Sequence, residues 1–331
     1  MGTMRLPEPE PQSSPGHLSS PALVLAALVG VAAVLAGAFG ITAAGQATLN
    51  GLVAGSYLGL GAIGLTLVFG VLRLVNFAHG DLLTAGAYFT IGLSALGLPL
   101  GLAVPGAVVG CALLAYATEA LVWRPMRDAR AGSLQLFLTA IGLALVIRFS
   151  IQFVSGSQAR TLGIDILSSF EIGAVHLGLM QGIVLVAGLV AMGLVGLMLR
   201  HSTLGKQMRA YADNRALAEV SGVETRRIVI VTWLLSGLLA GLAGLLYAAA
   251  IGTFNPNFGL TLLLSLFAAA ILGGIGNAYG ALVGGLIIGL SQEWATLFVN
   301  PRWKPAVGFV ILILTLLLLP QGIFGKARRK S

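Results

Sequence analysis

The sequence contains few charged residues. Only 9% of its 331 residues are Asp, Glu, Lys or Arg, and 57% are hydrophobic. Soluble domains carry about 25% charged residues, so this composition excludes an ordinary soluble protein. Because one membrane-spanning helix needs ~20 apolar residues, we expect an all-α polytopic membrane protein with about eight to ten transmembrane helices.

Cysteine is almost absent, since Cys111 stands alone within an apolar run. This excludes intrachain disulfides and a cysteine-based metal site. The sequence also lacks the phosphate-binding pattern G-x-x-x-x-G-K-[ST]. The glycine-rich stretch 273–277 has no lysine and lies between apolar runs. We therefore expect no catalytic residue, metal or cofactor on this chain. The net charge of +8 arises in loops and the C-terminal tail, so it does not indicate nucleic-acid binding.

Apolar runs occupy most of the chain. Residues 1–20 are rich in Pro, Ser and Glu, which predicts a disordered cytoplasmic tail. Residues 21–322 form the predicted transmembrane domain, and 323–331 form a basic cytoplasmic tail. The first two runs are separated only near Gly45, and the run 261–274 is short enough to suggest a re-entrant or tilted hairpin with 279–298. The runs extend approximately over 22–41, 46–70, 82–98, 101–122, 133–154, 177–199, 228–251, 261–274, 279–298 and 305–320.

The basic residues predict an orientation. Most of them lie in the three segments 124–130, 200–227 and 326–330. Cytoplasmic loops collect Lys and Arg, so we expect these segments on the cytoplasmic side together with both termini. An even number of spans follows from this arrangement.

A polar cluster, Arg73–Asp81, interrupts two long apolar runs. In one interpretation it is a loop whose Asp81 caps a helix beginning at Leu82. In the other it is a broken-helix segment that lines a substrate path through Asn76, His79 and Asp81. Asn277 and Tyr279 form a loosely similar break, and such paired breaks can mark a transport pathway.

The longest polar stretch between spans is 200–227. Its Ala-rich part, Ala210–Val220, predicts a short amphipathic helix that Gly222 ends. A solvated basic loop is the simpler interpretation. The pattern is, however, similar to the coupling loop of ABC importer permeases. The residues assigned to such a loop are Gly205, Arg209, Ala212, Asp213, Asn214, Ala218, Glu219 and Gly222.

Three charged residues lie inside apolar runs. Glu119 is near the end of its run, where it can pair with Arg124 or extend to the interface. Arg148 and Glu293 are deeper, and an unpaired charge there is costly. We expect each of these two to face another helix or a wet cavity, and a functional gate is the alternative.

Several further segments follow one another in a characteristic order and spacing. They are Asn50-Gly51-Leu52, Val75–Asp81 with Gly86-Ala87-Tyr88, Leu239–Gly244, Ala270–Ala281 and Pro320–Gly325. With the loop above they cover roughly residues 46–326, and they resemble LivH-type permeases of branched-chain amino acid ABC importers.

This resemblance implies an inner-membrane subunit that moves branched-chain amino acids without hydrolysing ATP. ATP and Mg would bind to two separate ATP-binding cassette subunits. The other implied partners are a second, LivM-like permease subunit, a periplasmic substrate-binding protein and membrane lipid. A permease of the same type for urea or short-chain amides stays an alternative, because selectivity would rest mainly with the binding protein. A stand-alone transporter coupled to ions through His79, Asp81 and Glu293 is a third hypothesis.

Overall fold

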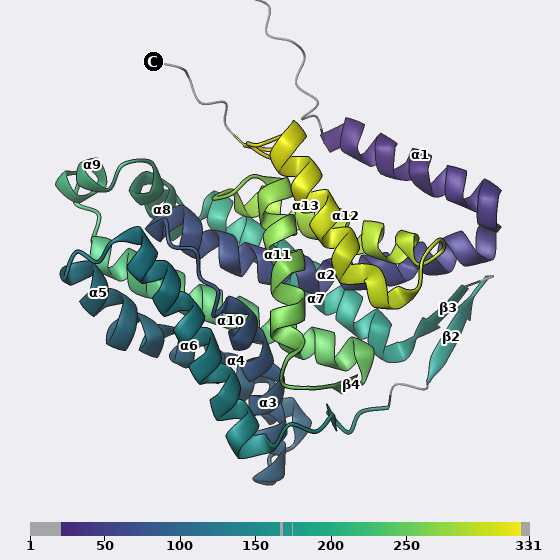
Figure 1. The fold of residues 1–331 in the computed structure, drawn as a ribbon, viewed down its shortest axis with the longest axis horizontal. Coiled ribbons are helices and arrows are strands. Elements are labelled where there is room, and N and C mark those ends of the chain that lie inside the picture. Colours follow the sequence, from purple (N-terminus) through teal and green to yellow (C-terminus); the bar gives the residue numbers. More distant parts are fainter. Residues whose placement is uncertain (1–20, 166–167, 174, 326–331) are drawn as a thin grey trace, which may run out of the picture.

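The computed structural model describes residues 21–165, 168–173 and 175–325 (Figure 1). Most of these residues are helical, and every apolar run predicted from the sequence forms a helix. The predicted all-α fold is therefore confirmed. The tail predicted at 1–20 and most of the basic tail predicted at 323–331 lie outside the described residues.

The secondary structure of the described residues is dominated by long helices, and their strands form one short hairpin and one short strand pair. The helices are α1 (Pro21–Phe39), α2 (Ile41–Leu72), α3 (His79–Ala95), α4 (Leu100–Thr118), α5 (Arg124–Asp128), α6 (Ser133–Ser155), α7 (Leu179–His201), α8 (Thr203–Asp213), α9 (Arg215–Val220), α10 (Thr225–Ile251), α11 (Phe258–Gly273), α12 (Ala278–Ala295) and α13 (Lys304–Leu318). A π-helical turn, η1 (Glu119–Trp123), joins α4 to α5, and a 3₁₀ turn, η2 (Pro301–Trp303), precedes α13. Strand β1 (Arg160–Thr161) pairs with β4 (Thr253–Phe254), and β2 (Ser169–Ile172) pairs with β3 (Val175–Gly178), both antiparallel.

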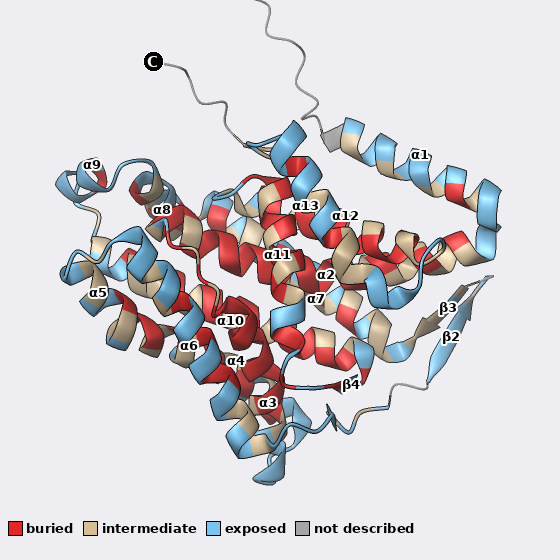
Figure 2. Ribbon diagram, viewed as in Figure 1, coloured by how far each residue is buried: buried red, intermediate tan, exposed pale blue. Residues whose placement is uncertain are grey.

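Helix α2 forms the centre of the bundle. Its 32 residues span about 48 Å, and 89% of its most apolar stretch is buried. It packs against α7, α10, α11 and α12. Figure 2 shows buried positions concentrated on α2, α3 and α10, whereas exposed positions dominate α1, α6 and α13. The exposed side chains of these outer helices are largely Leu, Val, Ile and Phe, which suits a lipid-facing surface.

The separation between the first two helices differs from the prediction. The chain turns at Gly40, where φ is +87°, and α2 then continues through Gly45 without a break. A glycine inside an apolar helix is tolerated, whereas only the positive φ at Gly40 requires one.

Helices α2 and α12 approach each other closely because each presents glycines four positions apart. A Cβ atom added at Gly285 would lie 2.3 Å from the Gly59 Cα, and one added at Gly289 would lie 2.3 Å from the Gly55 backbone nitrogen. Lipid offers no hydrophobic drive for helix association, so such small-residue surfaces supply the van der Waals contact instead.

Within residues 21–165, 168–173 and 175–325, six helical segments are long and apolar enough to cross a membrane, and two shorter apolar helices accompany them. The shorter ones are Leu23–Phe39 and α11. Helix α11 packs against α12, the helix with which the sequence pairs it. The six longer segments are α2, Leu100–Asp128, α6, α7, α10 and Pro301–Leu318.

Two of the basic segments lie at the same end of the bundle. Helix α5 carries the first, and α8 and α9 carry the second; Figure 1 shows them together at the left. The β2–β3 hairpin lies at the opposite end. The bundle therefore has one basic end, as the charge pattern predicted for these two segments.

Candidate functional site

The polar cluster begins where α2 ends. Arg73 adopts a left-handed conformation, with φ of 54°, and its Nη2 donates to the Ala212 carbonyl of α8 at 3.4 Å. The chain then re-enters the bundle, where Asn76 is buried. The Asn76 Oδ1 accepts a hydrogen bond from the Ala78 amide at 3.1 Å. This local turn sets the direction of α3.

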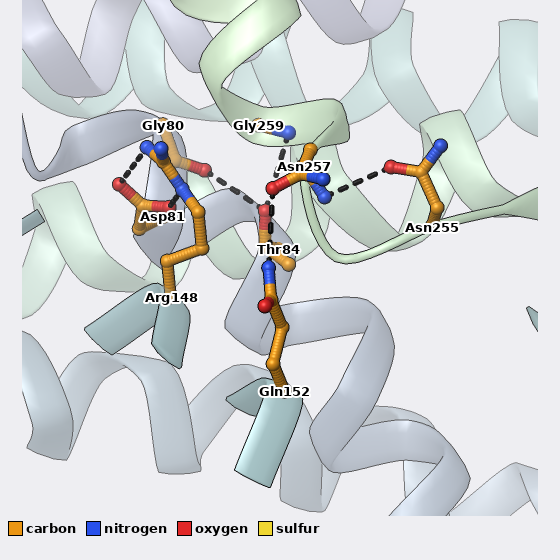
Figure 3. A network of polar contacts seen from close by, with 8 residues as sticks. All are labelled: Gly80, Asp81, Thr84, Arg148, Gln152, Asn255, Asn257 and Gly259. Atoms are coloured by element: carbon orange, nitrogen blue, oxygen red, sulfur yellow. Dashed lines mark hydrogen bonds and ion pairs between the residues drawn. The ribbon is translucent and has the colours of Figure 1, made fainter. Parts of the chain in front are cut away.

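The start of α3 differs from the expectation. The helix begins at His79 rather than Leu82, and the side chain of Asp81, in the first turn, makes no capping bond. Instead, Arg148 of α6 donates to Asp81 through Nε at 2.8 Å and through Nη2 at 3.0 Å (Figure 3). The capping prediction was wrong because a two-point bond to a guanidinium is stronger than a bond to a neutral amide.

The Asp81–Arg148 pair is almost completely buried, with side-chain exposures of 1% and 9%. The expectation that Arg148 faces another helix is thus confirmed. Figure 3 shows polar contacts beside the pair. Thr84 Oγ1 accepts from the Gly259 amide at 3.2 Å, and Gln152 Nε2 donates to Asn257 Oδ1 at 3.2 Å. These bonds join α3, α6 and the start of α11.

His79 is fully buried and links three helices. Its Nε2 lies 2.9 Å from the Gly61 carbonyl of α2, and its Nδ1 lies 3.5 Å from the Ser236 hydroxyl of α10. A carbonyl only accepts, so the proton belongs on Nε2, and Nδ1 is left to accept from the hydroxyl. This arrangement makes His79 a structural donor.

The second polar break shares one feature with the first, an Asn side chain that accepts a hydrogen bond from the amide two residues further on. Asn277 Oδ1 accepts from the amides of Tyr279 at 3.1 Å and Gly280 at 3.2 Å, which caps α12. Its Nδ2 donates to the Phe324 carbonyl at 3.2 Å. The Tyr279 hydroxyl donates to the Gly196 carbonyl of α7 at 2.5 Å. Asn277 and Tyr279 thus bond α12, α7 and the C-terminal segment, whereas Asn76, His79 and Asp81 bond other elements.

Substitutions at Asn277 can test whether this residue has a structural role, as the cap of α12, or binds substrate. Asn277→Ala should lower the free energy of unfolding by about 1–2 kcal/mol, because two amides of α12 lose their acceptor. Asn277→Asp keeps the acceptor and should retain most of the stability. Thermal unfolding of the purified variants measures both. Equal losses in the two variants would contradict the capping role.

The polar stretch 200–227 contains two helices rather than the single helix expected over Ala210–Val220. Helix α8 ends at Asp213, and α9 begins at Arg215. Between them Asn214 has φ of −155°, and its side chain accepts from the Leu217 amide at 3.0 Å. Asn is a strong N-cap, so it starts a new helix in preference to continuing the first.

The other residues assigned to this stretch hold it against the bundle or end its helices. A Cβ atom at Gly205 would lie 2.2 Å from the Leu199 carbonyl, so α7 and α8 meet in a turn that only glycine allows. Arg209 donates to the same carbonyl. Ala218 is buried. At the end of α9 the Gly222 amide donates to the Glu219 carbonyl, and the Val223 amide donates to the Ala218 carbonyl. The φ angle of Gly222 is +84°. Gly222 therefore ends the helix as predicted.

Comparison with known proteins decides the family. A model described as "Branched-chain amino acid transport system / permease component" matches residues 47–316. The chain belongs to this family. Together with the six apolar helices, this makes it a multi-pass membrane subunit of a transport system.

Individual relatives agree with the family. The high-affinity branched-chain amino acid permease LivH of Escherichia coli is 30% identical over 295 residues, which is 85% of this chain and 95% of that protein. BraD of Pseudomonas aeruginosa is 29% identical over the same shares. The ribose import permease RbsC of Escherichia coli is 27% identical, over 78% of this chain and 80% of that protein. A solved structure, PsaBC from Streptococcus pneumoniae in complex with Fab, aligns with a TM-score of 0.49 at 11% identity, over 91% of this chain and 98% of that one.

In this permease family member, sequence reasoning missed several partners of the polar residues. The sequence predicts that Arg148 needs a partner but does not identify Asp81 as that partner. Opposite charges in two separate apolar runs were the available signal. No such signal identifies Ser236 and Thr84 as partners, because a hydroxyl group within a membrane helix commonly forms a hydrogen bond to its own helix.

Proposed function

We propose that the chain is the permease subunit of an ATP-driven importer that moves branched-chain amino acids across the bacterial inner membrane. The observation that carries this proposal is the family match over residues 47–316, with relatives named as branched-chain permeases. In this proposal two partner ATPases bind ATP and Mg²⁺. A LivM-like permease subunit completes the membrane part, and a periplasmic binding protein delivers the substrate.

The orientation in this proposal places α5, α8 and α9 in the cytoplasm and the β2–β3 hairpin in the periplasm. The basic residues of α5 and of the α8–α9 segment support it, because positive loops stay on the cytoplasmic side. The binding protein would then dock at the end that carries residues 156–178.

Two features of the α8–α9 segment support the proposal that it contacts the ATPases. Leu217 and Val220 of α9 are 64% and 88% exposed, which leaves apolar side chains free to meet a partner. The segment is also attached to the bundle, through Gly205 to α7 and through Ala212 to Arg73. Movement imposed on α8 and α9 would therefore reach α7 and α2, the central helix.

An ion-coupled transporter is the less well supported alternative. The residues suggested for ion coupling already have internal partners: Arg148 binds Asp81, and Lys304 Nζ donates to Glu293 Oε1 at 2.5 Å. His79 is hydrogen-bonded to the Gly61 carbonyl. Each of these groups has a structural explanation in the described part of the chain.

The substrate is tested by uptake in vesicles containing the permease pair, both ATPases and the cognate binding protein. We expect ATP-dependent uptake of radiolabelled leucine, with competition by isoleucine and valine. Calorimetry should show that the binding protein binds the same three amino acids. Uptake of urea or ribose in place of leucine would overturn the substrate assignment. Leucine uptake that persists without the ATPases would overturn the importer assignment.

Gly222 tests the coupling role of α8 and α9. Gly222→Val should reduce ATP-dependent uptake several-fold, because a branched residue at φ +84° costs about 1–2 kcal/mol and shifts the end of α9. Gly222→Asn is the matched control, since Asn tolerates this conformation. No atom lies within 4 Å of a Cβ added there, so the difference reports backbone geometry alone. Unchanged uptake and unchanged ATPase association in Gly222→Val would contradict the assignment.

A further inference from the structure

A cavity of about 330 Å³ lies at the basic end of the bundle, apart from the polar cluster of α3. It is formed between the α4–η1–α5 segment, the α8–α9 segment and the first turns of α10. Four arginines and two carboxylates supply its charged groups, so the charged lining has an excess of positive charge. The residues that line it are Tyr116, Glu119, Ala120, Arg124, Arg127, Asp128, Tyr211, Arg215, Thr225, Arg226, Val229 and Ile230.

The carboxylates are already engaged. Glu119 is buried and binds Arg127 at two points, one of them a 3.0 Å bond from Nη1. The sequence suggested Arg124 as its partner, but Arg124 instead lies 3.9 Å from Asp128 in an exposed pair. The π-helical turn Glu119–Trp123 lies at this position. Such turns are rare in proteins, and those that occur are often found at functional sites.

Two arginines of the cavity have no carboxylate partner among the described residues. Arg215 lies over the ring of Tyr211, with its guanidinium carbon 5.8 Å from the centroid. Arg226 is exposed in the first turn of α10, where the helix dipole is also positive. A cation at this end of a helix is unfavourable by itself, and a bound anion would relieve the repulsion. The cavity is therefore suited to a negatively charged group.

The lining changes from charged to apolar along both helices that form its walls. Tyr116, Ala120, Arg124 and Asp128 follow one another at four-residue spacing, so they share one face, with the charged members at the basic end. Helix α10 runs the opposite way, from Arg226 to Val229 and Ile230. Helices α4 and α10 pack together, so the two gradients coincide. A ligand that fits has an anionic head and an apolar body.

We propose that this cavity binds the phosphate head group of an anionic phospholipid. Basic pockets between membrane helices are suited to such head groups, and the charged excess favours an anionic lipid over a zwitterionic one. Arg215 and Arg226 would bind the phosphate, while Tyr116, Val229 and Ile230 would contact the start of the acyl chains. The lipid would touch α4, α10 and α9 together. The proposal depends on the membrane location of the chain and not on the transported substrate.

The test is native mass spectrometry of the full chain in mild detergent, titrated with phosphatidylglycerol or with phosphatidylcholine of the same acyl chains. We expect one phosphatidylglycerol to bind selectively. Arg226→Ala should weaken its binding about fivefold, and adding Arg215→Ala should weaken it about fivefold again. Ala120→Phe, which fills the apolar wall without changing charge, should also weaken it. Arg227→Ala is the matched control, because this neighbouring arginine lies outside the cavity lining.

Several outcomes would overturn the proposal. Equal retention of the two lipids would show that the cavity does not select an anionic head group. Equal weakening by Arg227→Ala would show that general surface charge holds the lipid. Displacement of phosphatidylglycerol by an equal concentration of inorganic phosphate, with no effect of Ala120→Phe, would show a site for a free anion.

Discussion

Replacing Arg148 by methionine is expected to lower the free energy of unfolding by about 3–5 kcal/mol. The substitution leaves the Asp81 carboxylate buried without its partner, since the side chain of Asp81 is only 1% exposed. Helix α6 also loses its bidentate attachment to α3. The expected result is a strong loss of monodisperse protein in size-exclusion chromatography and a lower midpoint of thermal unfolding.

Two further variants separate the charge effect from general damage. The double variant Asp81→Leu/Arg148→Met removes both charges and should recover most of the stability, because a buried pair replaced by apolar groups is often neutral. Arg124→Ala breaks an exposed pair, at 51% and 72% side-chain exposure, and should cost at most about 1 kcal/mol. If Arg148→Met lowered the free energy of unfolding no more than Arg124→Ala does, the buried pair would not have the structural role assigned to it.

The same double variant distinguishes a fixed attachment from a moving part. A pair that only holds α6 to α3 predicts that the stable double variant still supports uptake. A pair that opens and closes during transport predicts a stable protein without uptake. Measuring thermal stability and uptake on one preparation therefore tests the gate that the sequence suggested for Arg148.

Gly244→Ala is expected to destabilise the bundle by about 3 kcal/mol, the upper part of the range for overpacked cores. A Cβ atom there would lie 1.9 Å from the Leu83 carbonyl oxygen and 2.8 Å from the Leu83 Cα. These are backbone atoms, so no side-chain rotation relieves the clash. Helices α3 and α10 must move apart, and the contacts around His79 would be strained with them.

Gly193→Ala in α7 is the matched control, because no atom lies within 4 Å of a Cβ added there. Alanine has the higher helix propensity, by about 1 kcal/mol, so this variant should be neutral or slightly stabilising. Thermal unfolding in detergent measures both variants. The same midpoint for the two would show that α3 and α10 are less closely packed than the structure indicates.

The sequence determined where the helices lie. In lipid every backbone amide must be satisfied internally, so each apolar run had to become a helix. Local side-chain chemistry gave further detail that was correct, such as the end of α9 at Gly222. Two local predictions were wrong. Asn214 caps a new helix and so divides the helix predicted over Ala210–Val220. The chain turns at Gly40, although the break between the first two helices was predicted near Gly45.

Only the tertiary structure decided what the polar residues do. Asp81 and Arg148 are 67 positions apart, and the sequence between them does not predict that α3 and α6 pack against each other. His79 likewise bonds a carbonyl of α2, whose position depends on how α2 packs in the bundle. The sequence could show that a charge at membrane depth needs a partner, because the cost is local. It could not name the partner, because that depends on which helices pack together, and glycine surfaces such as those of α2 and α12 determine this through close backbone contact.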